Sequence, residues 1–388
     1  MISVEEALAR CLALVTPMAA ETVPLTDAYG RWMCAPAVAR RDQPPFAASA
    51  MDGYAVAGDP KPGDSFAVVG EAGAGHAFGG RVGAGDAVRI FTGAPVPDGA
   101  TRVIIQEDVA AGGARITVKD GADAGPHIRP LGQDFRAGDS LSPRRLRPND
   151  LALLAAMNIA EVPVGRRPVV ALIATGDELV MPGEAPRPDQ IIASNNFALK
   201  AMVEAEGGEA RLLPIARDTE AELATVLALA RDADLIVTIG GASVGDHDLV
   251  GRVAGLERAF WKIAMRPGKP LIAGRLHGVP MLGLPGNPVS AIVCGHLFLV
   301  PMLRAMLGAA PGPFPRRAIL GADVGPTGPR THYMRARLSE GDGLPVITPF
   351  ERQDSALLSI LGQADALLIR PLGDGPRPRG EAVSYLPL

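Results

Sequence analysis

The sequence predicts a multidomain α/β protein: a central α/β domain with a parallel sheet, an inserted β module, a small helical domain and a C-terminal β-barrel-like domain. Three observations lead to this prediction. Residues 168–308 alternate continuous apolar strands with helices, residues 41–142 hold short Val/Ile runs between Gly and Pro, and short strands return after residue 311. The length of 388 residues is enough for about two to four domains, each with its own core.

Composition excludes several classes of protein. With 38 Lys and Arg against 42 Asp and Glu, the net charge is -4, so no sequence-wide basic field gathers nucleic acid or anionic lipid. The three cysteines lack the spacing of a zinc site, an iron–sulfur site or a redox pair. The chain begins Met-Ile-Ser-Val-Glu-Glu, with acids where a signal peptide carries basic residues. We therefore expect a cytoplasmic protein with no nucleic-acid or membrane partner.

The helical domain is expected to comprise residues 1–40 and 143–166. Ser3 and Glu6 form a capping box, and the apolar spacing that follows predicts a helix that continues until Pro17. A second helical pattern covers residues 148–157. The β module, expected at 41–142, lies between these two helical pieces and is predicted to contain strands at Asp86–Phe91 and Arg102–Gln106.

The α/β domain is expected at 167–309 and the C-terminal β domain at 310–388. Strands in the α/β domain are predicted at Val169–Ala174, Ala210–Ile215, Leu235–Ile239 and Val279–Leu284, with helices at Asn196–Glu206, from Thr219 to about Arg231, and at Val289–Leu307. The apolar stretch near its end is interrupted by His296, Pro301 and Arg304, which predicts a core helix rather than a membrane span. Strands in the last domain are predicted at Arg335–Leu338, Leu344–Thr348 and Ala366–Ile369.

Four polar loops follow the strands of the α/β domain. In such sheets ligands bind beyond the carboxyl ends of the strands, so these loops should meet at one edge. Each loop taken alone is explained by the needs of a short turn, but the four together favour a binding site. The loops are Thr175–Glu178, Arg217–Asp218, Gly240–Asp248 and Pro285–Pro288.

Two glycine-rich or basic segments of this domain suit an anion. Gly240–Gly245 has the glycines of a phosphate loop, but Asp246 and His247 stand where that motif needs Lys and Ser or Thr, so an ATPase of that kind is excluded. Its backbone N–H groups could still hold a phosphate. Residues 260–270 carry Lys262, Arg266 and Lys269, which form either a solvated cationic loop or a polyanion pocket.

The β module carries polar residues in three tight turns, Pro44–Val56, Phe91–Pro97 and Ile128–Asp134. By composition these are simply turns. Carboxylates spread over several segments, with no His or Cys cluster, would otherwise suit an oxygen-liganded ion such as Mg²⁺.

Taken together, these motifs resemble the molybdopterin molybdenumtransferase (MoeA) family, which includes the C-terminal domain of gephyrin. One motif alone would be weak, but the set recurs in order over nearly the whole chain. The matching stretches are Ser49–Val56, Thr92–Pro97, Ser194–Asn196, Gly240–Gly245, Pro267–Pro270 and Leu284–Ser290.

The resemblance implies an enzyme of molybdenum cofactor biosynthesis with an α/β domain of the molybdopterin-binding type. Such enzymes insert molybdate into adenylylated molybdopterin and release AMP, assisted by Mg²⁺. It also implies a homodimer whose active site lies between the α/β domain of one subunit and the β module of the other. Molybdopterin adenylyltransferase and molybdoenzyme chaperones are the expected protein partners.

The resemblance also carries roles to individual positions. Metal ligands are expected at Asp52, Glu178, Asp218 and Asp248. The catalytic set comprises these four and Thr92, Lys262 and Arg266. Substrate-binding residues are expected at Arg129, Asp134, Gly240, Gly241, Ser243, Lys269, Pro285, Gly286, Asn287, Pro288, Arg335 and Ser355.

The sequence departs from the family pattern at two places. Ala47 and Ala48 follow Phe46 where the family often has an acidic residue. Arg266 stands where the family often has Lys. The arginine keeps the positive charge but replaces a compact ammonium with a planar guanidinium, which donates in fixed directions. Two other functions stay open: a molybdopterin adenylyltransferase, whose single domain would need neither the β module nor the tail, and a non-catalytic scaffold of the same fold.

Overall fold

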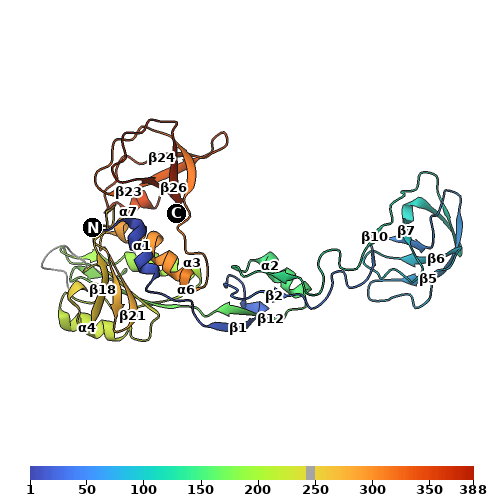
Figure 1. Ribbon diagram of the computed structural model, residues 1–388, viewed down its shortest axis with the longest axis horizontal. Coiled ribbons are helices and arrows are strands. Elements are labelled where there is room, and N and C mark those ends of the chain that lie inside the picture. The colour runs from blue at the N-terminus through green and yellow to red at the C-terminus, as the bar shows by residue number, and fades with distance from the viewer. Residues whose placement is uncertain (242–249) are drawn as a thin grey trace. The chain divides into compact units, whose positions relative to one another are not determined.

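The computed structural model describes residues 1–241 and 250–388, which form two compact units (Figure 1). Unit 1 comprises Met1–Glu21, Gly30–Cys34 and Val164–Leu388. Unit 2 comprises Thr22–Tyr29 and Ala35–Pro163.

Unit 1 is built on a six-stranded sheet of order β16-β13-β17-β21-β20-β18. Its strands are β13 (Val169–Ala174), β16 (Glu209–Leu212), β17 (Leu235–Ile239), β18 (Leu256–Trp261), β20 (Ile272–Leu276) and β21 (Val279–Leu284). The first four strands in this order are parallel, which confirms the predicted parallel sheet, and three of them have the predicted bounds.

Two antiparallel strands, β20 and β18, extend this sheet and were not predicted. β20 and β21 form a hairpin whose two-residue turn is His277-Gly278, with φ of 49° and 85°. Positive φ at both central residues matches the twist of a hairpin, but a histidine there lacks the Asn-Gly signature that a sequence search relies on.

Helices cover both faces of the sheet. They are α1 (Val4–Leu12), α3 (Asn195–Glu206), α4 (Glu220–Ala228), α5 (Pro288–Cys294), a π-helical turn (Gly295–Leu299) and α6 (Val300–Met306), with a short 3₁₀ turn at Val250–Arg252. In β13, Val170 and Leu172 pack with the helices of one face, whereas Ala171 and Ile173 pack with α4 on the other. This alternation is the period of two expected of a strand buried on both sides.

The stretch Pro288–Met306 is long and apolar enough to cross a membrane, but 83% of it is buried inside the domain. It runs through one core cluster, as the predicted core helix requires. Pro301 has no N–H to donate, and the helix passes this point through the π-helical turn, where the N–H of Val300 donates to the carbonyl of Gly295.

Helix α1 begins as predicted, with the Ser3 hydroxyl accepting from the N–H of Glu6 at 3.1 Å. It ends at Leu12, earlier than the predicted stop at Pro17. Its buried residues Val4, Ala7 and Cys11 belong to the core of unit 1, whereas α2 (Pro148–Ala156) lies in unit 2.

The C-terminal segment of unit 1 forms the predicted barrel. Its strands are β22 (Arg316–Leu320), β23 (Thr331–Ser339), β24 (Val346–Pro349), β25 (Ala366–Arg370) and β26 (Ala382–Pro387), with the short helix α7 (Leu358–Leu361) before β25. The pairing of β23 with both β24 and β25 closes a ring of five strands. Strand β19 (Met265–Arg266) leaves the α/β domain and pairs in parallel with β23.

Unit 2 contains a second six-stranded sheet, of order β7-β4-β6-β5-β9-β8. Its strands are β4 (Gly53–Val56), β5 (Ser65–Ala72), β6 (Asp86–Ile90), β7 (Arg102–Ile105), β8 (Val109–Gly112) and β9 (Arg115–Val118). The shorter elements of the chain are β1 (Ala20–Pro24), β2 (Ala37–Val38), β3 (Ala48–Ser49), β10 (Ile128–Arg129), β11 (Ser140–Leu141), β12 (Glu161–Gly165), β14 (Leu179–Val180), β15 (Ile191–Ile192) and 3₁₀ turns at Leu25–Asp27 and Gln106–Asp108.

Gly53 opens β4 directly after Asp52 because the neighbouring strand leaves no room for a side chain. A Cβ at this position would lie 1.9 Å from the carbonyl oxygen of Ile104 in β7. The glycine therefore lets β4 pair closely with β7 and fixes where Asp52 leaves the sheet.

We predict that Gly53→Ala lowers the free energy of unfolding of unit 2 by about 1–3 kcal/mol, the usual cost of overpacking. Gly79→Ala is the matched control, since a Cβ at Gly79 meets nothing within 4 Å. Urea denaturation of both variants checks this, and an unchanged midpoint for Gly53→Ala would contradict it.

Candidate functional site

A cavity of about 430 Å³ lies at the carboxyl ends of the parallel strands in unit 1. Each of the four predicted loops contributes to its lining. The lining includes Glu178, Asp218, Gly240, Gly241, Pro270 and Pro285–Pro288, together with Ser194–Asn196 at the start of α3. Ser243 and Asp248 lie outside the described residues.

Glu178 stands in a tight turn directly after β13. Gly176 in this turn has a φ of 149°, and a Cβ on it would lie 2.4 Å from a carboxylate oxygen of Glu178. The Glu178 side chain therefore folds back over the glycine. Asp177 Oδ1 accepts from the N–H of Asp218 at 3.0 Å, which ties this turn to the loop after β16.

Gly240 and Gly241 allow the loop after β17 to approach the end of β13. Their φ values are 92° and 63°, and a Cβ on either would lie 2.7 Å from an oxygen of Thr175. A Cβ on Gly286 would lie 3.6 Å from the Cα of Gly240. This side of the cavity is thus formed mainly by backbone, as a site that binds phosphate through N–H groups requires.

Residues of the barrel complete this region. The Asn287 amide donates to the hydroxyl of Ser355 at 3.2 Å, and the N–H of Val289 donates to the Ser355 carbonyl at 3.1 Å. Arg335 is 1% exposed, and its guanidinium donates to Gln353 and to the carbonyl of Asp354. Arg335 therefore holds the segment that presents Ser355, and its own donors are directed at protein oxygens.

The three predicted cations have different surroundings in the structure. The Lys262 ammonium lies over the ring of Trp261, 3.6 Å from its centroid. Lys269 immediately precedes Pro270, which lines the cavity, whereas Arg266 lies on β19 against the barrel. The N–H of Ile263 donates to the carbonyl of Lys269 at 3.1 Å, so the segments of Lys262 and Lys269 lie side by side, whereas Arg266 contacts the barrel.

Arg266 lines a small pocket of about 110 Å³ with residues of the barrel, including Thr327, Arg330 and His332. Burial, and after it the positive charges of Arg266, Arg335, Arg330 and Arg370, together lower the pKa of His332 to about 4. His332 is therefore neutral near pH 7, and the pocket concentrates positive charge.

In unit 2 the structure brings Asp52 and Thr92 together. The carboxylate of Asp52 accepts from the N–H of Thr92 at 2.7 Å and from its hydroxyl at 2.8 Å. These bonds, with the nearby charge of Arg89, lower the pKa of Asp52. Arg129 and Asp134 line a neighbouring groove with Phe46.

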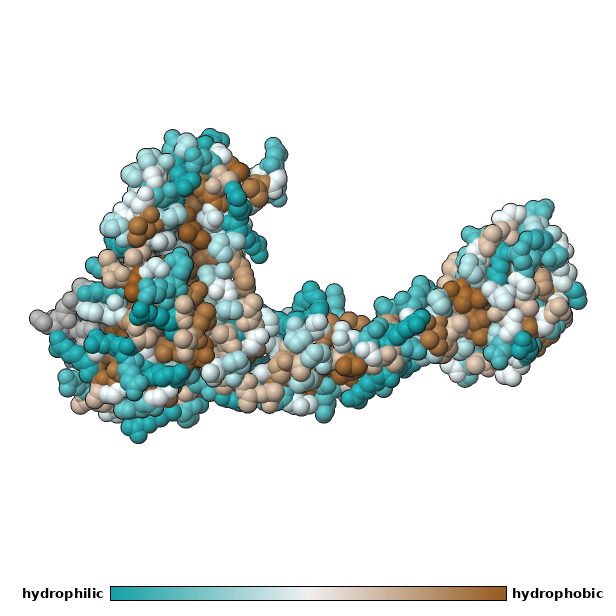
Figure 2. All heavy atoms as spheres, in the orientation of Figure 1, coloured by the Kyte–Doolittle hydropathy of each residue, from teal (hydrophilic) through white to brown (hydrophobic). Residues whose placement is uncertain are grey.

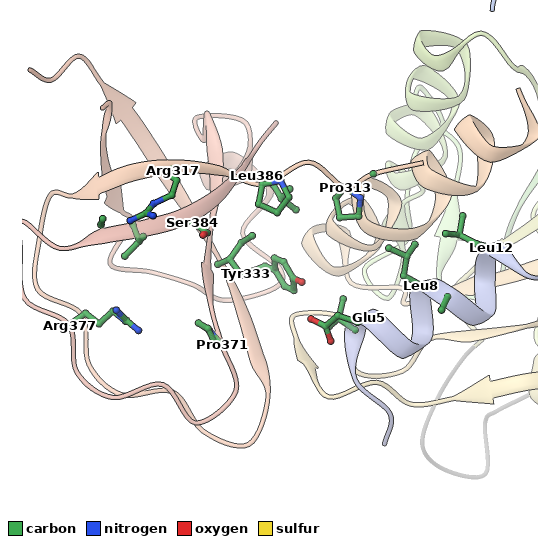
Figure 3. A pocket seen from close by; sticks show the side chains of 17 residues that line it. Glu5, Leu8, Leu12, Pro313, Arg317, Tyr333, Pro371, Arg377, Ser384 and Leu386 are labelled. Atoms are coloured by element: carbon green, nitrogen blue, oxygen red, sulfur yellow. The ribbon is translucent and has the colours of Figure 1, made fainter. Parts of the chain in front are cut away.

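A further groove of about 700 Å³ lies between α1 and the barrel. Leu8 and Leu12 point from α1 toward Tyr333 and Leu386 of the barrel (Figure 3). Hydrophobic residues also gather at the surface where the barrel adjoins the α/β domain (Figure 2). The groove is mainly apolar and contains none of the predicted site residues.

The donor set of the cavity fits Mg²⁺ that is held jointly with a substrate. Within the described ranges, no group of three or more His, Cys, Asp or Glu side chains is placed to hold a metal ion. Glu178 and Asp218 nevertheless line one cavity. Mg²⁺ commonly takes one or two carboxylates together with phosphate oxygens and water, so two carboxylates beside a phosphate-binding loop match its needs.

Fold and site together define a class of protein: a molybdopterin-binding-type α/β domain combined with a β module and a C-terminal barrel. The models of the MoeA N-terminal region (domains I and II), a probable molybdopterin binding domain, and the MoeA C-terminal region (domain IV) match residues 2–158, 171–305 and 317–388. The chain belongs to the MoeA family.

Individual relatives cover nearly the whole chain. Molybdopterin molybdenumtransferase 2 of Mycobacterium tuberculosis is 36% identical over 371 residues, 90% of each chain. Molybdopterin molybdenumtransferase of Nostoc is 34% identical, over 95% of this chain and 88% of its own. The crystal structure of a molybdopterin biosynthesis MoeA protein from Pyrococcus horikoshii matches with a TM-score of 0.84 and 31% identity, covering 100% of this chain and 99% of its own.

Sequence reasoning missed Asn195 as a site residue, although it lies in a motif matched to the family. Its amide donates to the carbonyl of Gly286 at 2.8 Å, and it lines the cavity. Arg217 lies in one of the four predicted loops, but nothing local in the sequence shows which groups its side chain reaches.

We predict that His332 makes the stability of the barrel depend on pH. Its pKa is about 4 in the folded chain and about 6.5 in the unfolded chain, so the unfolded chain binds more protons between these values. The free energy of unfolding should therefore rise as the pH increases from about 4 to about 6.5. His332→Gln should flatten this rise in urea titrations, and an unchanged slope would contradict the assignment.

Proposed function

We propose that this chain inserts molybdate into adenylylated molybdopterin and releases AMP, which yields molybdenum cofactor. The observation that carries the proposal is the cavity in which Glu178 and Asp218 lie beside the Gly240-Gly241 and Pro285–Pro288 loops. Carboxylates for a divalent ion and backbone donors for phosphate are what an adenylylated, phosphorylated substrate requires.

Mg²⁺ is the proposed cofactor, with Glu178 and Asp218 as its ligands in this cavity and Asp52 and Asp248 as further ligands. When bound, it would offset phosphate charge and polarise the bond to AMP. The carboxylates of Glu178 and Asp218 hold negative charge at the cavity rim, where water can reach both side chains. Thr92 keeps Asp52 ionised through two hydrogen bonds.

Cationic and polar side chains are proposed to bind the anionic substrates. Lys262, Arg266 and Lys269 suit phosphate groups and the molybdate dianion. Asn287, held by Ser355, and the adjoining backbone of Gly286 are proposed to bind the nucleotide or the pterin phosphate. Arg129 and Asp134 are proposed to bind substrate from the groove of the β module.

The proposed assembly is a cytoplasmic homodimer with four domains per subunit, in which α1 packs with the core of the α/β domain. The resemblance to the family supports an active site in which the β module of one subunit supplies Asp52 and Thr92 to the α/β domain of the other. Molybdopterin adenylyltransferase and molybdoenzyme chaperones are the proposed partners for supply of substrate and removal of product.

We predict that Glu178→Gln lowers molybdate-stimulated AMP release by at least about a hundredfold, since the metal's contribution is worth several kcal/mol. Glu184→Gln is the matched control, because Glu184 lies on the same segment and its carboxylate accepts only from the N–H of Met181 among the described contacts. AMP release from adenylylated molybdopterin with Mg²⁺ and molybdate is the measurement.

The same assay separates the alternatives. Molybdate-independent consumption of ATP with unmodified molybdopterin would favour an adenylyltransferase, and absence of both reactions would favour a non-catalytic scaffold.

We also predict that mixing Asp52→Asn and Glu178→Gln subunits restores activity. If each site combines Asp52 of one subunit with Glu178 of the other, a mixed dimer has one site with both residues intact, and random exchange yields about a quarter of the wild-type activity. Subunit exchange is verified by mass spectrometry of differently tagged chains. Exchange without recovery would contradict the shared site.

A further inference from the structure

Arg217 is a half-buried arginine outside the expected set of site residues, and its side chain reaches into the turn that carries Glu178. A single atom, Nη1, donates to the carbonyls of Gly176, Asp177 and Leu179 at 3.2, 3.1 and 3.0 Å. The remaining carbonyl of the turn, that of Glu178, accepts from the N–H of Ile191 at 2.8 Å. All four carbonyls from residue 176 to residue 179 therefore have fixed partners.

This contact joins the two loops that supply carboxylates to the cavity. Arg217 precedes Asp218 directly, so the side chain that fixes the Glu178 turn leaves the backbone next to Asp218. Asp177 adds two hydrogen bonds between the same loops. Its Oδ1 accepts from the N–H of Asp218, and its own N–H donates to Asp218 Oδ2 at 3.4 Å. The N–H of Gly176 donates to the carbonyl of Ala216 at 3.1 Å.

The turn needs such support because its own backbone does not fix it. Within residues 176–179 of the described chain, a single backbone hydrogen bond joins the N–H of Leu179 to the carbonyl of Gly176 at 3.5 Å, at the limit of a hydrogen bond. Gly176 is at a φ of 149°, which gives this end of the turn little conformational restriction. Without Arg217, three carbonyls would lose a charged donor.

We propose that Arg217 is a positioning residue that sets the separation of the Glu178 and Asp218 carboxylates, and thereby the affinity of the cavity for a divalent cation. This inference rests on the proposed Mg²⁺-dependent function. Among the described residues, the side-chain hydrogen bonds of Arg217 go to backbone carbonyls, so it acts through the two carboxylates and not on the substrate. Groups that orient metal ligands commonly contribute about ten- to a hundredfold to metal affinity.

The test compares Arg217→Met, which removes the donors and the charge, with Arg217→Lys, whose ammonium offers three donors to the same carbonyls. The probe is Mn²⁺ binding in the presence of AMP, followed by electron paramagnetic resonance of the intact protein. We expect the Mn²⁺ dissociation constant to rise about tenfold or more in Arg217→Met and to recover largely in Arg217→Lys.

The matched control is Arg275→Met, because Arg275 also donates to two backbone carbonyls, those of Gly278 and Leu14, but away from the cavity. Its Mn²⁺ affinity should equal that of the wild type. If Arg217→Met does not fold, Arg217→Gln, which keeps the two donors of a neutral amide, takes its place and should show an intermediate loss.

Kinetics give a second readout. In AMP release, the Mg²⁺ concentration for half-maximal rate should rise in Arg217→Met, whereas the KM for molybdate should stay unchanged. Wild-type affinity for Mn²⁺ in Arg217→Met would overturn the inference while leaving the proposed function intact. Failure of the wild type itself to bind Mn²⁺ would instead overturn the proposed Mg²⁺ site.

Discussion

The parallel register of strands β16, β13, β17 and β21 is the constraint on which the candidate site in unit 1 depends. Ala174 pairs with Ile239, and Ile239 pairs with Leu284, so these three strands end at the same level of the sheet. Their loops then start side by side and enclose one cavity. A slip of one residue would exchange the two buried faces of a strand, so the packing of helices on both sides fixes the register, and the register fixes the site.

Close backbone approach is the second feature of this region. Because Gly240 and Gly241 have no Cβ, oxygens of Thr175 can lie close to them. Gly176 likewise leaves room for the Glu178 carboxylate, which folds back over it. Such contacts leave no space for side chains, which accounts for part of the high glycine content of the chain. The same need operates in unit 2, where Gly53 lies against the Ile104 carbonyl and sets the position of Asp52.

The sequence predicted three strands of the α/β domain at their observed bounds, but the strand predicted at 210–215 ends at Leu212, and the side-chain contacts were predicted poorly. Strands at 169–174, 235–239 and 279–284 are long apolar runs with clear boundaries, and the structure has them at the same residues. The hairpin turn at His277 and Gly278 was missed because its first residue is not one that turns usually employ. Arg266 was grouped with Lys262 by spacing, whereas its backbone pairs with a barrel strand that begins 65 residues further along the chain.

By itself, the sequence determined the family, the positions of three parallel strands and which polar residues follow them, because these depend on local patterns of apolar residues and glycines. Only the tertiary structure decided which of those residues meet. Asn287 and Ser355, which are hydrogen-bonded, lie 68 positions apart in the sequence. The Arg217 side chain donates to carbonyls of the Glu178 turn that lie 38 to 41 positions earlier. The buried guanidinium of Arg335 donates to barrel carbonyls 17 to 19 positions away. Such contacts join segments brought together by sheet and barrel closure, and nothing in the neighbouring residues of either segment specifies the other.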